Sequence, residues 1–399
     1  MRDADFALLE RKGTLDYAFE LGFLVAQQRP HGRYVESESQ SSNGLRKTQW
    51  SCPPHQASPV NTIIAQCGAV LQEKEQKVKL IRGTDQDEVM KNWWNTPSVR
   101  DSWVVRPSLE AVSRPGCSPG EYEWVGISLR SPLYSQHELK KKDAPAKHAI
   151  SALRSAIKIH VNSTCLFTVY LQPHGGVFEA QQLKKVAVMA WLLEHDFLIS
   201  LNGPKPHAHP ISRSSALAYE GTPYTSAKLK AEAESWIPRC DIFVEPHLKD
   251  IWKCEDSRHL MEMLRGRYGA RLAFHIDAYQ HVDHDSTGSQ AFMVAFQYTS
   301  WHPYSRLDDS ELFIQFVLGI GHCMDHNKAT FCRLVTGYYN AVKSDSIWVH
   351  KQGQMYLLKV LGFDVTFADV WTDILEELGI GGELDPSCID RQPPLVGFE

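Results

Sequence analysis

The segment that decides the fold reads Leu15-Asp16-Tyr17-Ala18-Phe19-Glu20-Leu21-Gly22-Phe23-Leu24-Val25-Ala26. It is rich in aromatic and aliphatic side chains, which is typical of a β-strand. Side chains of a strand alternate between its two faces, so Glu20 and Gly22 share one face. The segment therefore predicts a strand that presents Glu20 and Gly22 on one face of a sheet.

Further strands and helices are indicated along the rest of the chain. Segments rich in β-branched or aromatic residues predict strands at 102–109, 122–133, 165–171, 271–276 and 291–299. Apolar residues at helical spacing predict helices at 61–78, with Asn61 as the cap, at 146–159 and 179–200, and in the C-terminal quarter at 310–323, 329–342, 352–361 and 367–378. The sum is an α+β fold, a mainly antiparallel curved sheet backed by helices, with a helix-rich C-terminal region.

Length and composition bound the organisation of the chain. Its 399 residues, 43% of them hydrophobic and 22% charged, are typical of a globular protein with a sizeable core. We find no internal repeat and no clear linker. The sequence predicts a single elaborated domain over 1–399, with a Ser/Pro-rich loop at 36–59 and a helical C-terminal part at 309–380.

Charge, hydropathy and cysteine usage exclude several function classes. A net charge of −5 provides no basic field, so a nucleic-acid partner is not expected. The charged N-terminus leads into no signal segment, and no apolar run is long enough to span a bilayer, so no membrane partner is expected. Nine scattered cysteines without a Cys-x-x-Cys pair indicate reduced thiols and a cytoplasmic protein. Nothing in the sequence specifies an oligomeric state.

Three of the predicted N-terminal strands resemble signature strands of the amidoligase family, which has a glutamine-synthetase-like fold and joins carboxylates to amines with ATP. Residues 17–24 resemble the family's aromatic-Gly-x-Glu-x-Glu-Phe strand, in which Glu20 keeps the first glutamate and Gly22 has lost the second. Residues 103–109 resemble the next segment, with Arg106 at the place of an aspartate. Residues 126–132 match Gly-x-Glu-x-x-Ser-Pro, with Ser128 in place of the glutamate.

The resemblance continues in the second half of the chain, and in all it runs from about residue 15 to residue 380. Residues 165–171 follow the family's Cys-Gly-Leu-His-Val-His-Val strand, with Thr168 and Tyr170 in place of the histidines. A Leu-Leu-Glu sequence at 192–194 and Arg213 match the helix and arginine segment that come next. Residues 291–297 match Thr-x-Glu-Phe-Arg-x-His. Here Met293 replaces the glutamate, Ala295 replaces the arginine and Gln297 replaces the histidine.

These departures fall on the face that lines the ATP and metal cleft of the family. Magnesium needs several hard oxygen ligands, and Glu20 alone does not supply them, so we expect no cofactor; the alternative is ATP with magnesium. A cleft re-lined with apolar, aromatic and a few polar groups suits a small organic molecule. The resemblance and its departures imply the substrate-binding residues Ser128, Thr168, Met293, Ala295, Gln297, Tyr298 and Arg213, with Arg106 and Arg130 as a clamp for an anionic group if both face the cleft. For either arginine alone, a surface position is the competing interpretation.

The sequence favours a small-molecule biosynthetic enzyme that catalyses ATP- and metal-independent cyclisation or isomerisation of a partly apolar substrate. Tyr170 and Glu20 are its first catalytic candidates. An ATP-dependent carboxylate–amine ligase and a non-catalytic binding protein remain alternatives. In each case the partner is a small molecule.

A second group of ionisable residues lies at 275–285. His281, Asp283, His284 and Asp285 are interpreted as a solvated turn between two strands rather than as a metal site. His275 and Asp277 belong to the strand before that turn. They are therefore catalytic candidates, as a general acid/base pair facing the cleft.

Overall fold

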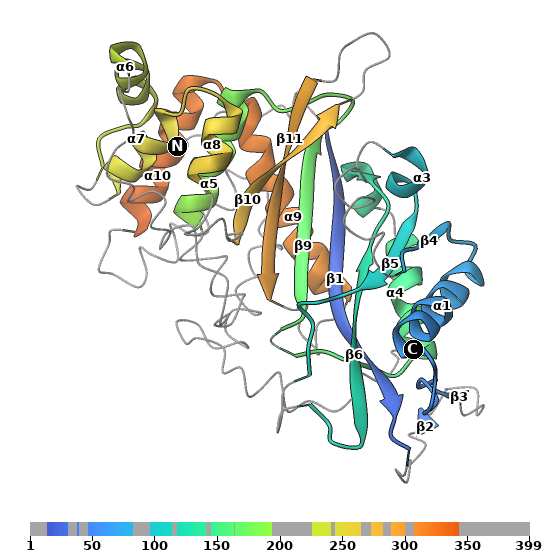
Figure 1. The fold of residues 1–399 in the computed structure, drawn as a ribbon. Coiled ribbons are helices and arrows are strands. Elements are labelled where there is room, and N and C mark those ends of the chain that lie inside the picture. The colour runs from blue at the N-terminus through green and yellow to red at the C-terminus, as the bar shows by residue number, and fades with distance from the viewer. Residues whose placement is uncertain are drawn as a thin grey trace.

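The computed structural model of the chain describes residues 14–30, 38–39, 47–82, 96–113, 118–140, 145–162, 164–193, 226–240, 244–264, 273–281, 289–299 and 307–342. Within these residues one sheet of nine strands dominates the molecule (Figure 1). Its path runs β10-β11-β9-β1-β6-β5-β4, and β7 and β8 add to β1. All of its pairs are antiparallel except β4 with β5.

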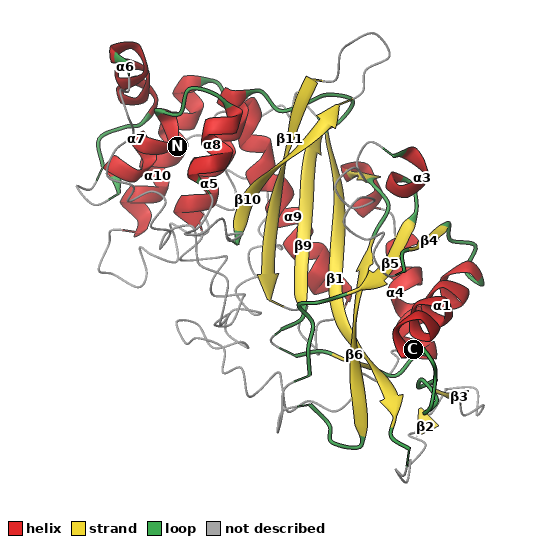
Figure 2. Ribbon diagram, in the orientation of Figure 1, coloured by secondary structure: helices red, strands yellow, loops and turns green. Residues whose placement is uncertain are grey.

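The strands of this sheet are β1 (Leu15–Gln28), β4 (Val78–Leu80), β5 (Trp103–Pro107), β6 (Tyr122–Arg130), β7 (Tyr134–Ser135), β8 (Ile159–His160), β9 (Leu166–Pro173), β10 (Phe274–His281) and β11 (Ser289–Thr299). The helices are α1 (Pro59–Gln72), α3 (Pro97–Arg100), α4 (Pro145–Ala156), α5 (Ala180–Leu193), α6 (Ala227–Trp236), α7 (Glu245–Trp252), α8 (Ser257–Met263), α9 (Leu307–Gly321) and α10 (Lys328–Val342), with 3-10 turns η4 (Gln136–Lys140) and η8 (His322–Asp325). Figure 2 shows two helical groups, α5 to α10 beside β10 and β11, and α1 with α4 beside β4 to β6.

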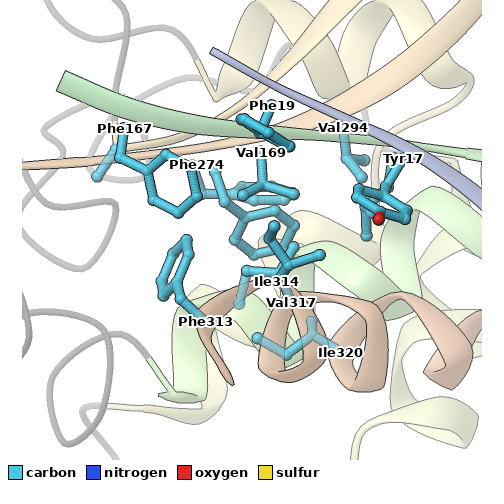
Figure 3. Close-up of a cluster of buried hydrophobic side chains, with 14 of the residues drawn as sticks. Tyr17, Phe19, Phe167, Val169, Phe274, Val294, Phe313, Ile314, Val317 and Ile320 are labelled. Atoms are coloured by element: carbon cyan, nitrogen blue, oxygen red, sulfur yellow. The ribbon is translucent and has the colours of Figure 1, made fainter. Parts of the chain in front are cut away.

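One face of the sheet carries the main hydrophobic core. Alternate residues of β1, β9, β10 and β11 point into it, and α9 packs against them from below in Figure 3. The labelled members of this core are Tyr17, Phe19, Phe167, Val169, Phe274, Val294, Phe313, Ile314, Val317 and Ile320. Residues of α1, α4, α5 and α10 belong to the same cluster, so helices back one face of the sheet, as predicted.

The predicted strands are confirmed, and their ends differ by a few residues. The largest shift is in β10, which extends to His281, so that histidine belongs to a strand and not to the predicted turn. Residues 283–285, the rest of that turn, lie outside the described residues. The antiparallel pairing of β10 with β11 agrees with a hairpin connection between them.

The predicted helices are also present, with corrected boundaries. The first begins at Pro59 and not at Asn61, because a proline fits the first helical turn, where its missing N–H is not needed. It ends at Gln72, and Glu75 has a positive φ of 58°, which helps the chain turn back so that Val78 can begin β4. Likewise Ile159 leaves the predicted helix and pairs with Val25 in the sheet.

Other expectations are confirmed in part. Helices at 307–321 and 328–342 match two of the four predicted C-terminal helices, and those at 352–361 and 367–378 lie outside the described residues. The predicted loop at 36–59 contains a short ladder, β2 (Glu38–Ser39) with β3 (Lys47–Thr48), and Pro59 already belongs to α1. Across the described part of the chain, none of the helices has the length and apolarity needed to cross a membrane.

Candidate functional site

The strand register brings the predicted site positions onto the second face of the sheet, opposite the main core. In one row across the strands, Gln297 lies opposite Thr168, Thr168 opposite Glu20, and Glu20 opposite Arg130. The neighbouring rows are His275–Ala295–Tyr170–Ala18, Gly22–Ser128–Arg106 and Asp277–Met293. Directly paired residues share a face. The predicted common face of Glu20, Ser128, Thr168, Tyr170, Met293 and Ala295 is therefore confirmed. We call it the site face.

Glu20 is the centre of a polar cluster on this face. Its Oε1 accepts a hydrogen bond from Ser128 and forms an ion pair with Arg106, and the Tyr170 hydroxyl donates to its Oε2 at 3.3 Å. The carboxylate is nearly inaccessible to water, with a side-chain exposure of 11%. Both oxygens of the carboxylate are thus bound by protein donors from β5, β6 and β9.

The two arginines occupy different environments within the cluster. Arg130 is fully buried and donates to the Val99 carbonyl of α3 at 3.1 Å. Arg106 lies nearer the margin, with 22% of its side chain exposed, and its Nε is a buried donor without a hydrogen-bond partner among the described residues. The competing interpretation of each arginine as a surface residue is wrong. Both converge on Glu20, because their β-sheet partners are on its face.

The charges of the cluster hold one another in the ionised state. Burial alone would raise the pKa of Glu20, but Arg106, Ser128 and Arg130 outweigh it and keep that pKa below its ordinary value. The Glu20 carboxylate in turn raises the pKa of Arg106 against the effect of burial. Burial lowers the pKa of Arg130 to about 9, so it is still protonated at neutral pH.

Gly22 lies beside Glu20 on this face, at a position where a side chain would be crowded. A Cβ on Gly22 would lie 3.0 Å from the backbone nitrogen of Leu166, at the start of β9. Contacts of that length with backbone are tighter than ordinary packing allows, so a side chain here would displace the neighbouring strand. A side chain at Gly22 would therefore require β9 to shift by a few tenths of an ångström.

The middle of the face is apolar. Ala18, Tyr170, Met293 and Ala295 form one cluster with Val99, Val104 and Tyr279, separate from the main core. His275 lies across Ala295 from Tyr170, and its Nε2 is 3.5 Å from Asp277 Oδ2. His275 is buried and the Asp277 side chain is 30% exposed, which places this pair at the opposite side of the face from the arginines.

One of the predicted binding residues, Tyr298, does not join this cluster. Gln297 pairs with Thr168 on the site face, and the next residue, Tyr298, pairs with Phe167. The position of Tyr298 therefore belongs to the other face of the sheet. The prediction for Tyr298 is wrong because it ignored the period of two along β11. A second predicted binding residue, Arg213, lies outside the described residues.

Three residues of the site face were missed by sequence reasoning. Asp16 and Gln172 form a direct cross-strand pair, and both are buried. Tyr279 lies opposite Ala291, and the small alanine lets its hydroxyl reach over β11 to donate to Gln172 Oε1 at 3.3 Å. Strand parity was the available signal, since Asp16 is four residues before Glu20 and Gln172 is two residues after Tyr170.

The lowered pKa of Glu20 makes a testable prediction about stability and pH. A carboxylate with a depressed folded-state pKa stabilises the fold fully above its unfolded pKa, and this stabilisation is lost as the pH falls through the folded-state value. The difference in unfolding free energy between wild type and Glu20→Gln should therefore stay constant above the ordinary value of 4.5 and shrink below it. Urea titrations from neutral pH down to about pH 3 measure this difference. Glu123→Gln, exposed on β6, is the matched control and should follow wild type throughout.

Comparison with known proteins adds no assignment: no family model, no curated protein and no solved structure matches the chain.

Proposed function

We propose that the site face binds a partly apolar small molecule and catalyses its cyclisation or isomerisation without ATP or metal, on a scaffold related to the amidoligases. The observation that carries the proposal is the buried Glu20 carboxylate held by Arg106, Ser128 and Tyr170. Buried, perturbed ionisable groups from several strands are characteristic of functional sites, since a structural core rarely needs them. The apolar cluster beside them supplies the surface that a hydrophobic substrate needs.

The donors around Glu20 do not suit the magnesium ions that the family resemblance implies. Magnesium needs several oxygen ligands in octahedral order, and here one carboxylate is already bound by a guanidinium and two hydroxyls. A second guanidinium, that of Arg130, interacts with the same carboxylate, so the local charge opposes a divalent cation. Gly22, next to Glu20 on the same face of β1, has no side chain and so supplies no further oxygen ligand. The proposed reaction therefore has no step that uses a metal ion or a nucleotide.

The chemistry follows from the residues that line the face. Arg106 polarises a substrate carbonyl, joined by Tyr170 when its single hydroxyl hydrogen turns from Glu20 to the substrate oxygen. Stabilising charge at that oxygen lowers the barrier to ring closure or proton shift. His275, paired with Asp277, takes a proton from the reacting atom and returns it to the product, so no proton is gained or lost overall. Ala295 separates His275 from Tyr170, so the two residues lie about two strand spacings, roughly 10 Å, apart across the sheet. Glu20 acts as a positioning residue that fixes both donors.

Binding of a simple probe tests the arginine. We expect undecanoate, an anion with an apolar chain, to bind the wild type, and Arg106→Gln to weaken binding at least tenfold. Loss of a hydrogen bond to a charged group costs about 1.5–3 kcal/mol, and about 1.4 kcal/mol is tenfold in affinity. Calorimetry measures the affinity of undecanoate for the wild type and for the variant. Arg100→Gln, exposed on α3 and paired with Asp101, is the control and should bind normally. Equal binding by wild type and a folded Arg106→Gln would contradict this placement of the ligand.

Nucleotide use separates the proposal from its alternatives. Incubation with magnesium, ATP and mixtures of carboxylates and amines should yield no ADP, and calorimetry should detect no ATP binding, because the face offers no set of oxygen ligands for the bridging metal. Stoichiometric ADP that disappears in chelator would establish the ligase instead. Tight ligand binding with no conversion of any bound compound would favour a binding protein.

A further inference from the structure

The site face has a second polar end, and it bears on the kind of molecule that the face accepts. Asp16 lies at the start of β1, on the same face as Glu20, and its buried side chain is only 10% exposed. Its Oδ1 is 2.7 Å from Nδ1 of His174, which is mostly exposed in the turn after β9. A carboxylate accepts several hydrogen bonds, so Asp16 can take another donor beside His174.

The two ends differ in charge and are separated by apolar surface. At one end Arg106 presents its buried Nε, and at the other stand the Asp16 carboxylate and its cross-strand partner Gln172. Ala18 lies between Asp16 and Glu20 on β1, and Tyr170 and Ala295 continue the same row. The Arg106 guanidinium contacts Glu20, and the four residues from Asp16 to Glu20 along β1 span about 13 Å, so the two ends are roughly this far apart.

We propose that Asp16 is a second subsite of this face and that the ligand is an elongated amino carboxylate. Its carboxylate binds Arg106, its chain lies along Ala18 and Tyr170, and its ammonium group binds Asp16. This inference rests on the proposed function, because it uses the same face and the same arginine. Charge complementarity at both ends fixes the orientation of the chain, and the apolar middle accepts methylene groups.

The experiment compares ω-aminoundecanoate, whose extended length is close to this separation, with undecanoate, which lacks the ammonium group. Calorimetry should show that ω-aminoundecanoate binds wild type more tightly than undecanoate does. Asp16→Asn should weaken ω-aminoundecanoate at least tenfold and leave undecanoate unchanged. His174→Ala is the matched control: it removes the partner of Asp16 but keeps the carboxylate, so it should bind ω-aminoundecanoate at least as tightly as wild type.

Chain length gives a test on the wild-type protein that does not depend on the folding of a variant. The shorter ω-aminohexanoate does not span the two ends and should bind at least tenfold more weakly than ω-aminoundecanoate. Equal affinity of the two amino carboxylates, or an equal effect of Asp16→Asn on both undecyl probes, overturns the second subsite. Arg106-dependent binding of undecanoate with no gain from the amine also overturns it and leaves the proposed function standing. Failure of every probe to bind overturns both.

Discussion

Glu20→Ala is expected to destabilise the protein by about 3–5 kcal/mol, the usual cost of removing one partner from a buried ion pair. The variant leaves the Arg106 and Arg130 guanidiniums without their shared carboxylate, and the charge of Arg106 already lowers the pKa of Arg130. It also removes the acceptor of the Ser128 hydroxyl. Urea unfolding monitored by circular dichroism measures the loss.

A double substitution distinguishes an electrostatic loss from a simple packing defect. Adding Arg106→Met to Glu20→Ala removes one of the two cations that the first change leaves unpaired, so the double variant should be more stable than Glu20→Ala alone. Neighbouring residues of one network are expected to couple in this way. If the two losses simply add, the ion pair contributes nothing and the cluster is held by its packing.

Gly126→Ala should cost about 3 kcal/mol or more, through a clash of backbone with a new methyl group. A Cβ at this position of β6 would lie 2.1 Å from the Ala111 carbonyl oxygen and 2.7 Å from that of Ser108. The 108–111 loop cannot withdraw cheaply, because Ser108 N donates to the Gly126 carbonyl at 3.0 Å and the Ser108 hydroxyl accepts from Ala111 N at 3.1 Å. Thermal and urea unfolding of the purified variant give the measurement.

Gly120→Ala is the control for that change, since a Cβ there meets nothing within 4 Å. It should be neutral or slightly stabilising, because alanine restricts the unfolded chain more than glycine does. Similar losses for the two variants would show that glycine matters here through general flexibility and not through close approach.

The alternation of side chains between the two faces of each strand was the sequence feature that predicted the site well. We call this alternation strand parity. Once the segments around Glu20, Ser128, Tyr170 and Met293 are strands, the period of two places their side chains, and the register agrees for all four. The same rule, applied to Tyr298, would have removed that residue from the site. Parity would also have added Asp16 and Gln172, which no motif pointed to.

The partners of these residues could not be predicted in the same way. That Arg106 pairs with Glu20 depends on β5 lying two strands from β1, with β6 between them, and a sequence gives no strand order. Gly126 and Ser131 are needed for contacts within the fold that a sequence motif does not reveal. Gly126 admits the 108–111 loop, and the Ser131 hydroxyl accepts from the Phe19 amide of β1 at 2.9 Å.

The central place of β1 has a consequence for how the chain folds during synthesis. The first described strand lies between β6 and β9, whose pairing residues come 94 to 110 and 146 to 158 positions later (Figure 1). Sheets closed by such distant contacts form slowly, since the loop entropy is lost before the pairing is gained. A strand of 14 residues therefore has no partner of the main sheet until β6 has been made, and its second long neighbour comes only with β9. Chaperone supply and translation speed should control the yield of this protein more than its final stability does.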